Sequence, residues 1–296
     1  MSDPQTPPPP HPLPWRAVGA AAAANPTGPG AAYDLERLPP LRILGLRPLK
    51  RWTYAAVFGS ELQLCVGLVE IAGAVQSFWA VHDRAMGTGG LYERTVRRRA
   101  VRVTPEGADF GHDGVRAEVE FLQDGEPVAV LSRHGGYPIW TRKTPVRAHG
   151  RVLLPGGDVR ELAGEPGLLD ESAGHHARRT AWYWSAGAGS TPDGRDVRWN
   201  LVSGIHDARS ASERTVWVDG EAREVPAVEF SGDLTTVTGG GTELRFTAEA
   251  ERARRDRLVV VDSAYRQPFG GYRGRLPGGI ELTGGRGVME RHIARW

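Results

Sequence analysis

Cysteine and lysine are nearly absent from this sequence of 296 residues. Cys65 is the only cysteine, which excludes a disulfide within the chain and is typical of a reducing compartment. It falls in the apolar run 62–69, so we expect a buried thiol and not a nucleophile. Lys50 and Lys143 are the only lysines among 37 basic residues. Because a buried amine can lose its proton and a guanidinium cannot, either lysine could have a function.

Long apolar runs, a strong net charge and phosphate-binding loops are also missing. No run of residues reaches the length of a membrane-spanning helix, and the N-terminus has no basic region of a secretory signal. The net charge of +2 is too small for a nucleic-acid-binding protein, and we expect the Arg-rich runs 97–99 and 252–257 to be solvated. We therefore expect a cytoplasmic protein that binds no nucleic acid, does not insert stably into membranes and holds no cofactor. Its protein partners stay unknown.

Glycine, proline and tryptophan are abundant, with 39, 22 and 9 residues. This composition suits short strands joined by turns, with aromatic side chains in strands and apolar pockets. The alternation over 115–121 predicts a half-buried strand, and the turn 123–126 predicts a hairpin with the strand that follows. A second Asp-Gly turn at Asp219 predicts another hairpin. Residues 248–257 could form a short helix or a charged turn.

The composition changes along the chain divide it into three parts. Residues 1–30 are rich in proline and alanine, and we expect them to be a disordered tail because they offer little apolar surface. The Gly/Pro-rich segment 155–170 is the expected junction between two β domains, which we place at 31–160 and 161–296. Short strands at this spacing are typical of sandwiches and up-and-down barrels.

Short motifs support a more specific prediction. They occur in one order along the chain and are the segments 50–54, 141–145, 170–174, 180–184, 213–220, 267–270 and 287–296. With these motifs the chain resembles a bacterial family of unknown function that is related to AttH-like proteins and to carotenoid 1,2-hydratase. The resemblance covers residue 45 to the end. It implies an all-β fold of two tandem lipocalin-like antiparallel β-barrels packed together, and no assigned reaction. Arg214 departs from the family pattern, in which a neutral amide follows Glu213.

Two strands carry the most suggestive side chains. Trp182 and Trp184 share a strand face, where they could line a ligand pocket or fill the core or the interface between barrels. Glu290 and His292 share a face of the last strand, close enough to interact. Glu290 could then hold the tautomer of His292, and the pair could protonate an alkene in a dry pocket. The alternative is a satisfied polar pair that pins the strand.

Five further residues are candidate ligand contacts: Asp170, His176, Asn200, Glu213 and Lys143. Asp170 and His176 show no recognised metal-ligand spacing, so we expect no metal and place His176 in a loop over the barrel mouth. Asn200 could contact a ligand or satisfy a backbone group. Asp170 with Glu213 or Glu290 could also form the carboxylate pair of a glycosidase.

Three classes of function fit these features. The first is binding of a hydrophobic small molecule (a lipid, isoprenoid or polyketide-like compound) in a β-barrel pocket, with acid–base catalysis such as hydration or isomerisation of an alkene. The second is a lipid carrier or sensor without catalysis. The third, ranked behind these, is a carbohydrate-binding or glycoside-acting protein.

Overall fold

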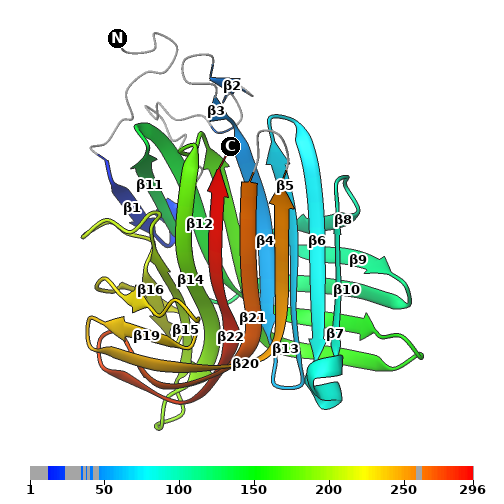
Figure 1. Cartoon of the computed structure of the whole chain (residues 1–296). Helices are drawn as coiled ribbons and strands as arrows, with labels where there is room; N and C mark the ends of the chain where they lie inside the picture. The colour runs from blue at the N-terminus through cyan, green and yellow to red at the C-terminus, as the bar shows by residue number, and fades with distance from the viewer. Residues whose placement is uncertain are drawn as a thin grey trace.

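The computed structural model describes residues 13–23, 35, 38, 41–42, 47–257 and 262–295. The expected fold class is confirmed, because these residues form almost only antiparallel strands, in two sheets that follow one another along the chain and pack together. Figure 1 shows the long strands of the second sheet beside those of the first. Within these ranges no helix has the length and apolar character needed to span a membrane.

The first sheet has eleven strands from the N-terminal half. Its path is β7-β6-β5-β4-β13-β12-β10-β9-β8, and β11 pairs with both β12 and β1. The strands are β1 (Trp15–Val18), β4 (Lys50–Phe58), β5 (Leu62–Ile71), β6 (Ala74–Asp83), β7 (Leu91–Val96), β8 (Val101–Thr104), β9 (Gly107–His112), β10 (Val115–Gln123), β11 (Val128–His134), β12 (Tyr137–Leu153) and β13 (Val159–Gly174). Smaller elements are α1 (Ala20–Ala23), the two-stranded β2 (Leu41–Arg42) and β3 (Arg47–Pro48), and a 3-10 helix (Arg84–Gly89).

The second sheet has nine strands in the order β17-β16-β15-β14-β22-β21-β20-β19-β18. They are β14 (Arg179–Ser190), β15 (Asp196–Ser203), β16 (Thr215–Val218), β17 (Glu221–Glu224), β18 (Glu229–Phe230), β19 (Thr236–Gly239), β20 (Thr242–Arg257), β21 (Asp262–Leu276) and β22 (Ile280–Arg295). The strands expected at 258–264 and 288–296 include residues 258–261 and Trp296, which lie outside the described residues.

Each sheet curls around an apolar core of its own. In the first sheet β8, at one end of the path, contacts β4 and β5 near its middle, so Leu64 and Phe110 share one core. In the second sheet Val216 of β16 and Val237 of β19 share a core although their strands lie near opposite ends of the path. Because neighbouring residues of a strand point to opposite faces, the other faces of the central strands are free to meet.

A third apolar cluster joins the outer faces of the two sheets. It contains Tyr54, Phe58 and Leu168 from the first sheet, and Trp184, Phe269 and Val288 from the second. The two sheets are thus held together by apolar contacts like those inside each one.

The expected hairpin at 123–126 is wrong. Strands β10 and β11 do not pair with each other, since β11 pairs with the first part of β12 and β10 with its last part. With 17 residues, β12 is long enough for both. The turn between them contacts the second sheet instead, where the N–H of Glu126 donates to the carbonyl of Gly220 at 2.9 Å.

The second Asp-Gly turn forms the expected hairpin, between β16 and β17. Asp219 and Gly220 have φ values of 51° and 83°, both positive as in a two-residue type I′ turn. The two Asp-Gly turns touch, because a Cβ added to Gly220 would lie 3.2 Å from the Cα of Gly125. Trp217 Nε1–H also donates to the carbonyl of Glu126 at 2.8 Å. These contacts fasten the sheets to each other.

Two local expectations also differ from the structure. Residues 248–257 are part of β20 and pair with β21, so they are neither a helix nor a turn; the tertiary partner strand overrides their helix propensity. Within the tail expected to be disordered, β1 adds to the edge of β11, and Ala17 and Ala22 pack against Ala129. The rest of that tail, residues 1–12 and 24–30, lies outside the described residues.

The division into two domains stays a prediction, but the sheets change at a different place from the expected junction. Strand β13 spans most of the segment 155–170 and pairs with β4 and β12 of the first sheet. Only Pro155, Gly156 and Gly157 form a turn there, between β12 and β13. The chain passes to the second sheet at residues 175–178, between β13 and β14.

Candidate functional site in the cavity between the two sheets

A cavity of about 580 Å³ lies between the outer faces of the two sheets. We expected a pocket inside a barrel; this cavity instead lies between the sheets, and the inner face of each sheet carries an apolar core. Eight of the nine candidate residues line the cavity: Lys143, Asp170, His176, Trp182, Trp184, Glu213, Glu290 and His292. The volume lies within the range of about 300–1,000 Å³ that is usual for small-molecule sites.

Aromatic rings form much of the cavity wall. Trp182 and Trp184 share a face of β14, and this face meets the first sheet. The rings of Trp184 and Tyr54 are 5.6 Å apart and nearly perpendicular, and Phe78 lies 6.2 Å from Tyr54. This wall could hold an apolar ligand by burying it against ring faces and edges.

Asn200 is the one candidate that does not line the cavity. Its Oδ1 accepts a hydrogen bond of 2.7 Å from Trp184 Nε1, and its Nδ2 donates to the backbone carbonyl of Glu213 at 2.9 Å. Asn200 is fully buried, and both groups of its amide are used within the protein. It therefore fixes the positions of Trp184 and Glu213 from behind.

Glu290 is a buried carboxyl group in the cavity wall. Its two oxygens accept hydrogen bonds from Trp182 Nε1 at 2.7 Å and from Gln267 Nε2 at 2.9 Å. Burial nevertheless raises the pKa of Glu290 to about 7, although hydrogen bonds from Trp182 and Tyr265 favour the charged form. At neutral pH this carboxyl group can therefore either donate or accept a proton.

His292 shares a face with Glu290, as expected, and its ring centroid lies 4.3 Å from that of Trp182. The expected hydrogen bond between His292 and Glu290 is not formed, because His292 Nε2 pairs with Ser263 Oγ at 2.9 Å and Glu290 bonds to other donors. Burial, together with the charge of Lys50, lowers the pKa of His292 to about 3. The imidazole is therefore neutral near pH 7, and Glu290 is the acid of the two.

One end of the cavity holds a buried ionic cluster. Lys143 Nζ lies 2.6 Å from Asp170 Oδ1 and 3.5 Å from Glu213 Oε2. Burial opposes the charge on Lys143, but the two carboxylates outweigh it, so the pKa of Lys143 is raised. Burial also raises the pKa of Glu213. Because one ammonium engages both carboxylates, Asp170 and Glu213 do not form a free glycosidase pair.

Two histidines complete this end of the cavity. His176 lies between β13 and β14, with its ring 5.2 Å from that of Trp52. His206 lies between β15 and β16 and pairs through Nδ1 with Ser132 Oγ at 2.9 Å. Burial lowers the pKa of both imidazoles well below the ordinary value. Sequence reasoning found His176 but missed His206, which stands in a segment without strand periodicity.

Lys50 also lines the cavity, at the start of β4. Burial lowers its pKa to about 6, whereas that of Lys143 is raised. The two lysines thus have opposite electrostatic environments, a difference that the sequence could not show. In the described part of the chain, no group of three or more His, Cys, Asp or Glu side chains is arranged to hold a metal ion.

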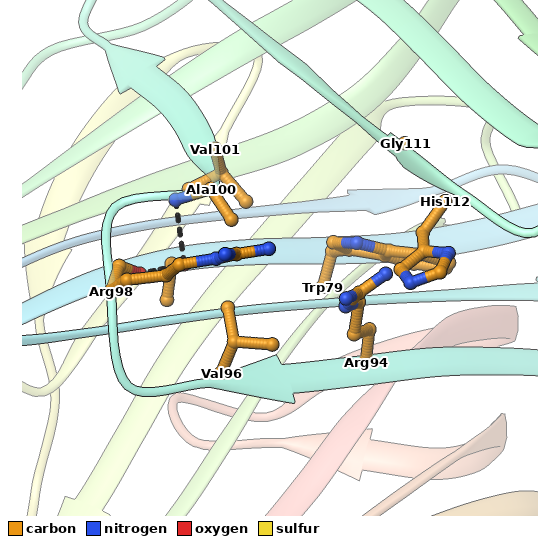
Figure 2. A pocket seen from close by; sticks show the side chains of 9 residues that line it. Trp79, Arg94, Val96, Arg98, Ala100, Val101, Gly111 and His112 are labelled. Atoms are coloured by element: carbon orange, nitrogen blue, oxygen red, sulfur yellow. Dashed lines mark hydrogen bonds between the residues drawn. The ribbon is translucent and has the colours of Figure 1, made fainter.

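A second cavity, of about 360 Å³, lies at the seam where the ends of the first sheet approach each other. Figure 2 shows the side chains of Arg94 and Arg98 reaching toward Trp79, with His112 beside them. Ser77 Oγ holds the adjoining loop by donating to the carbonyl of Arg98 and accepting from the N–H of Ala100. None of the nine candidate residues lines this cavity, so the cavity between the sheets is the candidate site.

The fold and the cavity define an all-β protein of two packed antiparallel sheets with a small-molecule-sized cavity between them. Residues 92–296 match the family described as Domain of unknown function (DUF2804), and the chain belongs to this family. The expectation of a family of unknown function is therefore confirmed. No curated protein matches the sequence significantly.

Several solved structures are similar to this chain. Kievitone hydratase from Nectria haematococca has 11% identity and a TM-score of 0.48, over 82% of this chain and 88% of that one. An AttH-type protein from Nitrosomonas europaea has 13% identity and a TM-score of 0.42, over 90% and 98% of the two chains. CghA has 13% identity and a TM-score of 0.41, over 83% and 88%.

Proposed function

We propose that this protein binds an apolar small molecule in the cavity between its sheets and transfers a proton to it from Glu290. The observation that carries the proposal is a buried carboxyl group with a pKa of about 7 in the wall of an aromatic cavity. A carboxyl group in such surroundings is an effective proton donor near neutral pH. An electron-rich double bond, as in an isoprenoid, is a suitable acceptor.

The chemistry follows from the neighbours of Glu290. The protonated carboxyl group donates its proton to one alkene carbon, and a carbocation forms at the other. Nearby indole and phenol ring faces stabilise a positive charge, while Trp182 and Gln267 stabilise the carboxylate that remains. The carboxylate then takes a proton from an adding water molecule, which completes hydration, or from a neighbouring carbon, which completes isomerisation. Glu290 is protonated again at the end of either route.

A second candidate function is that of a carrier or sensor for the same ligand. Both oxygens of Glu290 already accept hydrogen bonds within the protein, and this arrangement also suits a site that only holds its ligand. The two candidates use one cavity and differ in whether a proton moves.

Deuterium exchange distinguishes them. The purified protein is incubated in D2O with geraniol or farnesol, and mass spectrometry measures deuterium in the recovered alkene and in any hydrated product. We expect incorporation with the wild type, its loss in Glu290→Gln, and no change in Glu251→Gln, an exposed carboxylate paired with Arg266. Undiminished incorporation in Glu290→Gln contradicts the assignment of the acid, while binding without incorporation in the wild type supports the carrier.

A further inference from the structure

Two buried imidazole nitrogens of residues that line the cavity have no hydrogen-bond partner. They are His176 Nε2 and His206 Nε2, and Glu213, whose Oε2 lies 3.5 Å from Lys143 Nζ, lines the same cavity. The three residues are only 2%, 5% and 3% exposed. Leaving such an atom unsatisfied costs on the order of 1–3 kcal/mol, so their convergence on one cavity indicates a site built for hydrogen bonds to a ligand. We name this end of the cavity, formed by His176, His206 and Glu213, the head-group pocket.

The protein holds the residues of the head-group pocket in place from behind. Ser132 Oγ fixes the ring of His206 through its Nδ1, and Asn200 holds the backbone carbonyl of Glu213. The ring of Trp52 packs against His176. These contacts fix the two imidazole rings and the backbone of Glu213 before any ligand enters, which reduces the entropic cost of binding.

The charges around the head-group pocket restrict what it can accept. Lys143 is already paired with Asp170 and Glu213, so an ionic group on the ligand would have to compete with this buried ion pair and would lie near a like charge. Neutral imidazoles have one donor and one acceptor nitrogen, so their free Nε2 atoms can match either an oxygen lone pair or an O–H group. Uncharged oxygen groups therefore suit this pocket better than ionic groups do.

We propose that the head-group pocket binds an uncharged hydroxyl or carbonyl group at one end of an otherwise apolar ligand. The apolar remainder lies along Trp182 and Trp184, where Glu290 can reach its double bond. The head-group pocket and Glu290 belong to the lining of the same cavity. This inference rests on the proposed function for the apolar part of the ligand and adds the polar group that selects and orients it.

A ligand series with one apolar chain and different ends tests this inference. Isothermal titration calorimetry compares farnesol and farnesal with the hydrocarbon β-farnesene, with farnesoate and with farnesylamine. Because one hydrogen bond to a buried group is worth roughly tenfold in affinity, we expect farnesol or farnesal to bind at least about tenfold more tightly than the other three. The wild-type series requires no substitution, so it decides the question even where a variant does not fold.

Substitutions then show which residue causes the preference for an uncharged polar end. In His206→Leu we expect farnesol to bind no more than about threefold more tightly than β-farnesene. The affinity for β-farnesene itself should change little. His112→Leu, in the second cavity, is the matched control and keeps the full advantage. Equal binding of farnesol and β-farnesene by the wild type, or tightest binding of farnesoate or farnesylamine, overturns the head-group inference. Either result leaves the proposed function intact, provided that β-farnesene binds. If none of the five ligands binds, both the head-group inference and the proposed function are overturned.

Discussion

The indole of Trp182 donates a hydrogen bond of 2.7 Å to Glu290 diagonally across β14 and β22. In the register of this pair, Trp182 stands opposite His292, and Trp184 stands opposite Glu290. Diagonal neighbours on one face of an antiparallel pair lie within reach of long side chains. The contact ties the candidate acid to the aromatic wall, so the electrostatics of the acid depend on a residue that also forms the ligand surface.

Replacing Trp182 by Phe should raise the pKa of Glu290 further. The substitution keeps an aromatic ring and removes a donor that favours the charged carboxylate. We expect the pH dependence of deuterium incorporation to move to higher pH. Trp184→Phe is the control, because that indole donates to Asn200 instead. An equal movement in both variants, or a movement to lower pH, would contradict the assigned hydrogen bond.

Glu290 should also make the stability of the protein depend on pH. Its pKa of about 7 in the folded protein lies above the ordinary 4.5, so the folded state binds this proton more tightly than the unfolded state. The proton on Glu290 therefore contributes roughly 3 kcal/mol to the free energy of unfolding. This contribution is complete below about pH 4.5 and is lost as the pH rises through 7. Urea unfolding at pH 5 and pH 8 should show that Glu290→Gln loses less stability between the two pH values than the wild type does.

Removing the charge of Lys143 should cost far more than removing a surface charge. Lys143→Met leaves the buried carboxylates of Asp170 and Glu213 together, and we expect a loss of about 3–5 kcal/mol at pH 8. The loss should be smaller at pH 5, because Glu213, with its raised pKa, takes up a proton. Arg266→Met breaks an exposed pair with Glu251 and should cost no more than about 1 kcal/mol. Similar losses in urea unfolding of both variants would disprove the buried cluster.

Strand alternation was sufficient to predict which side chains share a face. It placed Trp182 with Trp184 and Glu290 with His292, because successive side chains of a strand point to opposite sides whatever surrounds them. It could not show which face points into a core, since both faces of β14 are covered. Tyr183 packs with the core of the second sheet, while Trp184 packs with the first sheet.

The partners of strands and turns were harder to predict than the strands themselves. The turn at Gly125 looks like a hairpin locally, yet β10 and β11 both pair with β12, and only the full length of β12 explains this. The same limit applies to the head-group pocket. Ser132 and His206 are 74 residues apart and meet only because the sheets pack.

The contact between the two Asp-Gly turns should contribute measurably to stability. Gly220 and Gly194 have almost the same φ, 83° and 84°. Alanine at either position is strained at positive φ, which costs on the order of 1 kcal/mol. A Cβ at Gly194 meets nothing within 4 Å, whereas one at Gly220 lies 3.2 Å from the Cα of Gly125 in the other sheet.

We therefore expect Gly220→Ala to destabilise the protein more than Gly194→Ala, by about 1 kcal/mol or more. Urea unfolding of the two variants measures the difference. The strain at positive φ is common to both and cancels, so the remainder reports the close approach of the two turns. Equal losses would mean that the sheets separate slightly there at little cost, and that the apolar cluster around Trp184 and Phe269 holds them together without the turns.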